Sequence, residues 1–308
     1  MKEEFINRLK ILSYLFVIQL LFANCQKDNN IEDSYSEWPD KIFSIIDIKP
    51  AWSPDGQWIA FEHGSLGETG IYLISPDGGE VKKWQTGIAS TPAWSPDGQW
   101  IAFSQNDQIW KKKINGDSLT QLTFEGRNFF PTWSPDGQWI AYDAFIRNIN
   151  KFYAIWKMKY NGTEKTLITI HSPEDGDIRM PNWGADFTIV HYRYIVGIGK
   201  SEIFTMDSVG GNITRLTYND ASDDYPKISE NSIAFTSKPR NDKLFHIWTI
   251  NTDGSGLKQL TQGYTCDWSP DGKQIVYTDS RAENGRLWIM DADGSNKKQL
   301  TFEYYFNF

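Results

Sequence analysis

The chain has 308 residues, of which 15% are aromatic and 14 are tryptophan, so it can bury a large core and is not of the disordered class. Lys and Arg number 31 against 39 Asp and Glu, which gives a net charge of −8. Because phosphate binding requires a basic face, this acidic balance argues against nucleic acid as the main partner.

Residues 1–24 are typical of a signal peptide. A short charged segment precedes 13 mostly apolar residues at 11–23, fewer than the roughly 20 that a bilayer-spanning helix needs. The run ends in LFANC, with Cys25 last, and polar residues follow. This ending resembles the lipobox of bacterial lipoproteins, although Asn24 replaces the usual small residue. The alternative is an ordinary cleaved signal with an incidental cysteine.

The lipobox resemblance implies that Cys25 becomes the lipidated first residue of the mature protein, anchored stably by more than one acyl chain. In the Gram-negative sorting rule an Asp after this cysteine retains the protein at the inner membrane, whereas Gln26 here favours the outer membrane. Cys266 then has no partner within the chain, and we expect it to be a small buried residue. The polar residues 25–40 are expected to form a flexible tether.

An internal repeat fills the rest of the chain. The motif WSPDG, followed by an apolar run, begins at Trp52, Trp94, Trp133 and Trp268, and degenerate copies begin at Trp183 and Ile228. The successive spacings are 42, 39, 50, 45 and 40 residues, which is the period of a four-stranded propeller blade. The sequence therefore predicts an all-β fold over 41–308, a six-bladed β-propeller of four-stranded antiparallel blades.

Each repeat reads as four strands, A to D. Strand A ends in the WSPDG turn, strand B is the apolar run after it, and strand C alternates in period two, as in IWKMK at 155–159. Glycine-bearing turns lead to strand D, which contains the QLT or RLT motif. Residues 41–50 are similar to a strand D that leads into the first blade; whether this segment closes the ring beside the last blade stays open, because that blade already has its own strand D.

Twelve of the 14 tryptophans lie at repeat-equivalent positions, eight in the A–B segments and four in strand C. This regularity predicts that they pack blades together and do not form a ligand platform.

The combination of WSPDGxxIAF, IWxMxxDG and QLT resembles the propeller repeat of the TolB family over about residues 50–303. Peptidase relatives contain the same repeat, but no GxSxG motif occurs here, so the resemblance is expected to extend to their propeller only. TolB-like proteins bind other envelope proteins, often peptide segments at the channel mouth. The resemblance therefore implies a protein or peptide partner, and the sequence itself predicts no cofactor.

In a propeller the B–C and D–A loops share one face, and here these loops vary in length and content. Functional residues concentrate on variable loops, so we expect the partner at this face, near the mouth of the central channel. Five residues expected just before strand A are the candidates for partner binding: Arg127, Phe130, Arg179, Tyr225 and Tyr264. The alternative is that these side chains only plug the channel.

An acidic cluster at 175–177 and 220–224 is expected on the same face, as a solvated loop or as a site for a cation or a basic patch. The four histidines occupy no common repeat position, so no metal site and no catalytic residue is predicted. The main hypothesis is a non-enzymatic envelope lipoprotein that binds a protein or peptide. The alternative is a carbohydrate-active protein, either a surface glycan binder or a metal-dependent enzyme similar to oligogalacturonate lyases, which use propeller histidines to hold a metal. A scaffold within a larger envelope complex is a third possibility.

Overall fold

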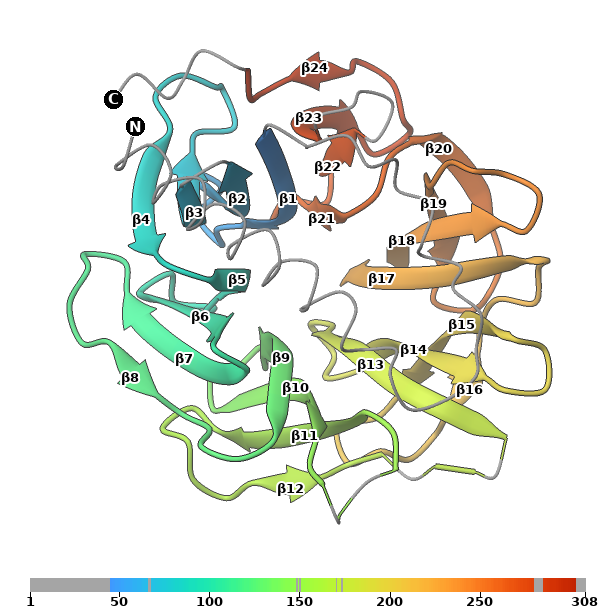
Figure 1. The fold of residues 1–308 in the computed structure, drawn as a ribbon. Coiled ribbons are helices and arrows are strands. Elements are labelled where there is room, and N and C mark those ends of the chain that lie inside the picture. The colour runs from blue at the N-terminus through green and yellow to red at the C-terminus, as the bar shows by residue number, and fades with distance from the viewer. Residues whose placement is uncertain are drawn as a thin grey trace, which may run out of the picture.

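The computed structural model describes residues 45–65, 68–147, 149, 151–169, 171–172, 174–279 and 285–302. Six four-stranded antiparallel sheets surround a common axis, where the central channel was predicted, and each sheet follows the chain order from its innermost to its outermost strand (Figure 1). The described residues contain no helix. The predicted six-bladed β-propeller is therefore confirmed. The signal peptide, Cys25 and the tether lie outside the described residues.

The blades are numbered in chain order. Blade 1 contains β1 (Ile45–Trp52), β2 (Ile59–Ser65), β3 (Glu68–Ile74) and β4 (Lys82–Thr86). Blade 2 contains β5 (Ala89–Trp94), β6 (Trp100–Gln105), β7 (Gln108–Lys113) and β8 (Thr120–Gln121). Blade 3 contains β9 (Arg127–Trp133), β10 (Trp139–Phe145), β11 (Ala154–Lys159) and β12 (Thr166–Leu167).

Blade 4 contains β13 (Asp175–Trp183), β14 (Ile189–Ile195), β15 (Lys200–Met206) and β16 (Thr214–Arg215). Blade 5 contains β17 (Ala221–Ser229), β18 (Ser232–Pro239), β19 (His246–Asn251) and β20 (Lys258–Gln262). Blade 6 contains β21 (Cys266–Trp268), β22 (Gln274–Asp279), β23 (Arg286–Asp291) and β24 (Lys298–Gln299).

The WSPDG turn is a compact hydrogen-bonded unit, which explains why the same residues recur in several blades. In blade 2 the Ser95 hydroxyl donates to the Asp97 carboxylate at 2.5 Å and accepts the Trp100 amide at 2.9 Å. Gly98 adopts a φ of 68°, a conformation that costs glycine little. The same bonds form in blades 1, 3 and 6, so this turn fixes the register of strands A and B.

The core lies between blades, in one buried apolar cluster at each of the six junctions of the described ring. Three of the five strand-A tryptophans link these junctions by hydrogen bonds, because their indole N–H groups reach the preceding blade. Trp94 donates to the Ala51 carbonyl, Trp133 to that of Ala93 and Trp268 to that of Lys227, at 3.0–3.2 Å. This arrangement confirms the predicted role of the tryptophans in packing. Cys266 is also buried as predicted, and burial raises the pKa of its thiol to about 12.

The ring closes by packing of blade 6 against blade 1 and not by a shared sheet. The prediction that residues 41–50 form a strand D is wrong for its described part, because β1 is the innermost strand of blade 1 and pairs with β2. The Trp52 amide donates to the Asp267 carboxylate at 2.8 Å, and the Asp47 amide donates to the Gly285 carbonyl at 3.0 Å. A single buried cluster joins Trp52 and Phe61 to Leu287 and Leu300 across this junction.

Candidate functional site at the channel axis

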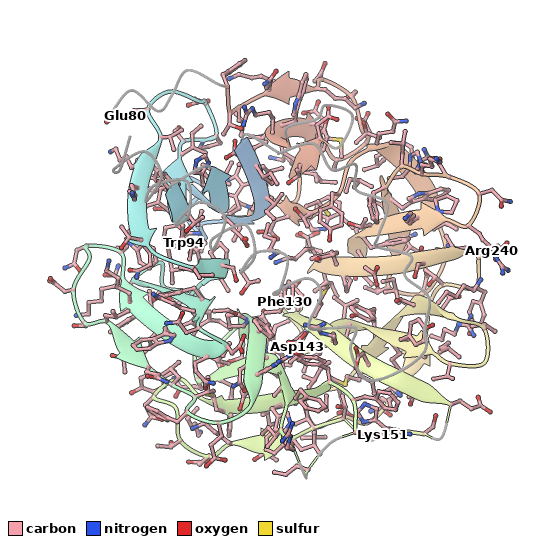
Figure 2. All side chains as sticks on the ribbon, viewed as in Figure 1. Glu80, Trp94, Phe130, Asp143, Lys151 and Arg240 are labelled. Carbon is pink, nitrogen blue, oxygen red and sulfur yellow. The ribbon has the colours of Figure 1, made fainter. Side chains whose placement is uncertain are left out.

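Two aromatic rings meet inside the channel although their blades are not neighbours. Phe130 on β9 of blade 3 and Tyr225 on β17 of blade 5 have ring centroids 5.8 Å apart, in an edge-to-face arrangement. Figure 2 shows Phe130 at the centre of the ring of blades. Since blade 4 separates their strands, these side chains extend across the channel and narrow it.

The backbone before the innermost tryptophan aims these side chains inward. In five blades a proline lies two positions before the equivalent of Trp52. The residue directly before this proline has a φ between 51° and 56°. The register of strands A and B shifts at the same place in each of these five blades. The residues are Lys49, Thr91, Phe130, Met180 and Tyr225. Because proline cannot donate to the ladder, it favours such a bulge, and a bulge redirects the side chain.

Tyr264 extends the aromatic surface from blade 6. Its hydroxyl donates to the Tyr225 hydroxyl at 2.8 Å, and the two ring centroids are 4.9 Å apart. Phe245 packs against the other side of Tyr264 with the same centroid distance, 4.9 Å. Burial raises the pKa of Tyr225, so its phenol stays protonated at neutral pH and serves as a hydrogen-bonding group.

Two cations border the aromatic rings. The Lys49 ammonium lies 5.7 Å from the Phe130 centroid and 2.9 Å from the Glu62 carboxylate. Burial by itself would lower the pKa of Lys49, but the charge and hydrogen bond of Glu62, together with Tyr225, outweigh burial and the pKa is raised. Lys49 is therefore held in its charged form.

The second cation is the Arg179 guanidinium. It lies 5.8 Å from the Phe130 centroid and 4.0 Å from that of Tyr153, and its Nε donates to the fully buried Asp143 carboxylate at 2.9 Å. The Met180 amide also donates to Asp143, at 3.3 Å. The carboxylate thus fixes both the guanidinium and the bulge beside it.

Four of the five predicted partner-binding residues converge here, namely Phe130, Arg179, Tyr225 and Tyr264. Arg127 does not join them: it lies at the start of β9, its side chain is 44% exposed, and its Nε is 3.9 Å from Asp107. The expectation that these residues precede strand A is wrong for four of them, because β9, β13 and β17 begin earlier than expected and contain them. Lys49, Glu62 and Asp143 were missed, although the X-Pro step in five of the six repeats was a usable signal.

The acidic cluster is not a solvated loop. Asp223 and Asp224 lie within β17 and are 0% and 8% exposed, and Asp175 in β13 is 8% exposed, whereas the Asp220 side chain is 75% exposed. Asp175 accepts a hydrogen bond from Arg193 at 3.1 Å. Burial, with the nearby Asp223, raises the pKa of Asp224 to about 7 against the opposing effects of a Ser201 hydrogen bond and Arg179. The extended inner strands, which alternate between channel and blade interface, account for this burial.

The histidines do not come together. His63 pairs with Asp47 at 2.7 Å and His246 with Asp242 at 2.8 Å, in different blades. His191 is fully buried, and burial with the neighbouring Arg193 lowers its pKa to about 3, so it is neutral. Across the described residues no group of three His, Cys, Asp or Glu side chains could hold a metal ion, and no helix is long and apolar enough to cross a membrane.

Comparison with known proteins identifies the repeat. The profile of the TolB beta propeller domain matches residues 41–193 and 179–305. The chain belongs to the TolB β-propeller family. The predicted family resemblance is thereby confirmed.

Individual relatives are distant. The crystal structure of TolB from Acinetobacter baumannii superposes with a TM-score of 0.67 at 21% identity, covering 85% of this chain and 65% of that one. An uncharacterized protein of Agrobacterium fabrum is 27% identical over 134 residues, which is 42% of this chain and 44% of that protein. The present chain therefore spans less than two thirds of these relatives.

An enzyme shares the same architecture. Oligogalacturonate lyase in complex with manganese superposes with a TM-score of 0.57 at 12% identity, covering 83% of this chain and 77% of that one. At this identity the likeness shows the fold alone.

Proposed function

We propose that this TolB-type propeller is a non-enzymatic envelope lipoprotein that binds a protein or peptide partner at its channel. The observation that carries the proposal is the half-buried cluster of Phe130, Tyr225 and Tyr264, bordered by the cations Lys49 and Arg179. Aromatic rings and arginine are the side chains that contribute most to protein interfaces. A peptide carboxylate or an aromatic side chain would find complementary groups there.

Binding, and not catalysis, fits the state of the charged groups. Each channel cation already has a buried or half-buried carboxylate partner, Glu62 for Lys49 and Asp143 for Arg179. These pairs hold the cations in fixed positions, which lowers the entropic cost of recognising a ligand. Three of the four channel residues that converge, Phe130, Arg179 and Tyr225, lie in the innermost strands of blades 3, 4 and 5, so most of the surface is held by strands.

The partner is sought by affinity capture from envelope extracts. We expect the purified propeller to retain a discrete protein and the double variant Phe130→Ala/Tyr225→Ala to lose it, because both rings of the cluster are removed. Phe124→Ala is the control, since this phenylalanine between β8 and β9 is 71% exposed and is not part of the cluster. Capture of the same protein by the double variant would contradict the channel site. Recovery of no protein, while a control lipoprotein retains its partner, would contradict the binding role.

The anchor is a separate part of the proposal. We expect the N-terminal peptide of the mature protein to carry an acyl mass on Cys25 and the protein to fractionate with the outer membrane. Cys25→Ser is expected to release it from the membrane, and Gln26→Asp to move it to the inner membrane. An unlipidated mature N-terminus would contradict the anchor and would leave the channel site unaffected.

A further inference from the structure

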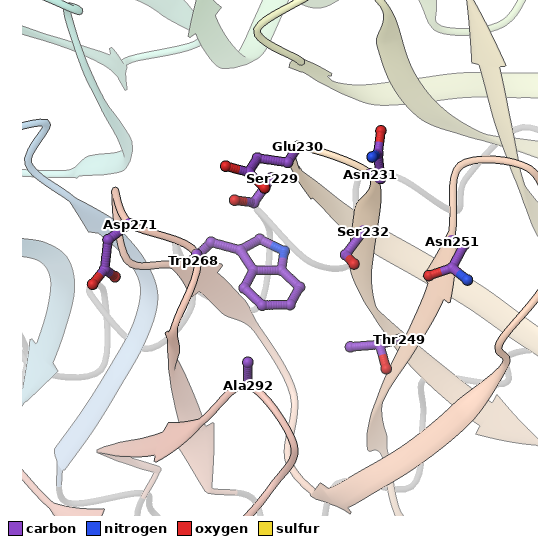
Figure 3. Close-up of a pocket in the computed structure, with 10 residues that line it drawn as sticks. Ser229, Glu230, Asn231, Ser232, Thr249, Asn251, Trp268, Asp271 and Ala292 are labelled. Atoms are coloured by element: carbon purple, nitrogen blue, oxygen red, sulfur yellow. The ribbon is translucent and has the colours of Figure 1, made fainter.

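A cavity of about 230 Å³ lies between blades 5 and 6, at the end of the ring where strand A turns into strand B. Figure 3 shows the Trp268 ring of blade 6 at its centre, with Ser229, Glu230 and Ser232 of blade 5 on one side. The variable loops lie at the other end of the strands. The channel site is also nearer that end, where strand A begins. The cavity is thus a second candidate site, and it does not depend on the proposed function.

The cavity exists because blade 5 departs from the repeat. In blade 2, Trp94 pairs with Ile101 across a six-residue turn, whereas in blade 5 Ile228 pairs with Ile233 and only four residues intervene. The shorter turn lacks the proline and aspartate of WSPDG. It also lacks the second tryptophan, so Ser232 stands where blade 2 has Trp100.

The equivalent volume is filled in blades 2 and 3. Trp100 lies beneath the ammonium groups of Lys111 and Lys113, at 4.5 and 5.4 Å from its ring. Trp139 lies beneath those of Lys157 and Lys159, at 5.0 and 4.1 Å. In each stack two ammonium groups lie over one indole ring, and the ring attracts each of these cations electrostatically.

The strand register shows what replaces this stack in blade 5. Lys111 pairs with Ala102 and Thr249 pairs with the equivalent Ala234, so Thr249 takes the place of the first lysine. Lys113 pairs with Trp100 and Asn251 pairs with Ser232, so Asn251 takes the place of the second. On the neighbouring blade, Ala292 takes the place of Tyr160, whose ring contacts Lys111 at 4.8 Å.

The charge of the lining selects for a cation. Two of the ten lining residues are acidic, Glu230 and Asp271, and none is basic. Asp271 is already engaged with Ser269 and Lys273. The exposed Glu230 carboxylate has no hydrogen-bond or ion-pair partner in the described part of the chain. The Trp268 N–H is used by the Lys227 carbonyl, so its ring is the part available to a ligand.

We propose that this cavity binds an aromatic ring with an ammonium group close to it, as adjacent aromatic and lysine side chains of a peptide present. The ring would occupy the place that Trp100 fills in blade 2 and pack against Trp268. The ammonium would lie near Thr249, which takes the place of Lys111, and the two carboxylates of the lining would favour its positive charge. Blades 2 and 3 thus supply a template for the group that blade 5 lacks.

The test uses the indole N–H resonances of ¹⁵N-labelled protein, with Trp268 assigned from a Trp268→Phe variant. Tryptamine is the probe, and we expect it to shift the Trp268 signal saturably with an affinity of about 1 mM, as for a small weak ligand. Indole-3-acetate has the same ring with an anion, and we expect it to bind at least about fivefold more weakly, since the lining is acidic. Glu230→Gln should weaken tryptamine about threefold, and the exposed Glu80→Gln should not.

A second variant tests the site by filling the cavity. Ser232→Trp/Thr249→Lys restores the stack of blade 2 and should abolish the tryptamine shift without lowering the melting temperature. The proposal is overturned if tryptamine leaves the Trp268 signal unmoved, or if indole-3-acetate binds as tightly. It is also overturned if methyl β-glucoside shifts the signal and tryptamine does not, because the site would then bind a sugar.

Discussion

At the scale of single residues, the proline after Phe130 and Tyr225 decides where these rings lie. A left-handed φ in a bulky residue costs of order 1–3 kcal/mol and persists only where the surroundings enforce it. Here the bulge, the neighbouring proline and the contact between the two rings enforce it together. In blade 6 Cys266 replaces the proline, Thr265 is not left-handed, and the register of β21 with β22 is unbroken. The proline therefore accounts for the difference between blades.

Asp224 makes the folded protein sensitive to pH near neutrality. Its pKa is raised to about 7 when folded, so the folded state keeps a proton that the unfolded state has already lost. Its contribution to the free energy of unfolding therefore falls as pH rises from about 4 to about 7 and is constant above that range.

We predict that Asp224→Asn melts at a higher temperature than the wild type at pH 8, by a few degrees, and that the difference shrinks toward pH 4. Thermal unfolding at several pH values measures it. Asp220→Asn, at a position whose side chain is 75% exposed, is the matched control and should show no such trend. A constant difference between Asp224→Asn and the wild type at all pH values would contradict the assignment.

At the scale of elements, the repeated turn shapes four of the blades, and a short outer strand also occurs in four of them. The outermost strands β8, β12, β16 and β24 have two residues each, which leaves little exposed edge for pairing with another chain. At the inner strands the WSPDG turn joins strand A to strand B through its hydrogen bonds. In blade 3, Asp136 accepts bonds from the Ser134 hydroxyl at 2.6 Å and from the Gln138 amide at 3.0 Å.

Asp136→Ala is expected to lower the free energy of unfolding by about 1 kcal/mol at pH 7, because two donors lose their acceptor. Burial opposes ionisation of Asp136, but its hydrogen bonds outweigh burial and lower its pKa, so the contribution is present near neutral pH and is lost as pH falls through that lowered pKa. Urea unfolding at pH 7 and in acid measures both effects. Asp77→Ala, in an exposed turn of blade 1, is the control; an equal loss there would contradict a specific role for the turn.

At the scale of the whole molecule, closure of the ring depends on contacts between its first and last blades. The Asp267 carboxylate accepts the Trp52 amide at 2.8 Å and lies 3.8 Å from the Lys227 ammonium, so it links three blades. Burial raises the pKa of Asp267, and Lys227 and the Trp52 amide limit the shift. Because no strand is shared between blades 1 and 6, this junction has only side-chain and loop contacts to hold it.

We predict that Asp267→Ala lowers the free energy of unfolding by about 2 kcal/mol, since the Trp52 amide is left without an acceptor. Asp267→Asn keeps an acceptor oxygen and should lose less. Urea unfolding measures the loss, and hydrogen exchange should show faster exchange of the Trp52 amide in Asp267→Ala. Asp253→Ala on an exposed turn is the control. Unchanged exchange at Trp52 would show that the junction does not rely on this bond.

The sequence by itself determined the number of blades, the order of the strands within them and the packing role of the tryptophans, because all three follow from a local repeat. Turn residues such as Ser95, Asp97 and Gly98 act on neighbours a few positions away, so the local sequence is sufficient to predict the turn. The tertiary structure alone decided that Phe130 meets Tyr225, that Asp224 is buried and that β1 closes the ring against blade 6. These features depend on residues from different blades that are brought together only when all six surround one axis, and no local pattern encodes such distances.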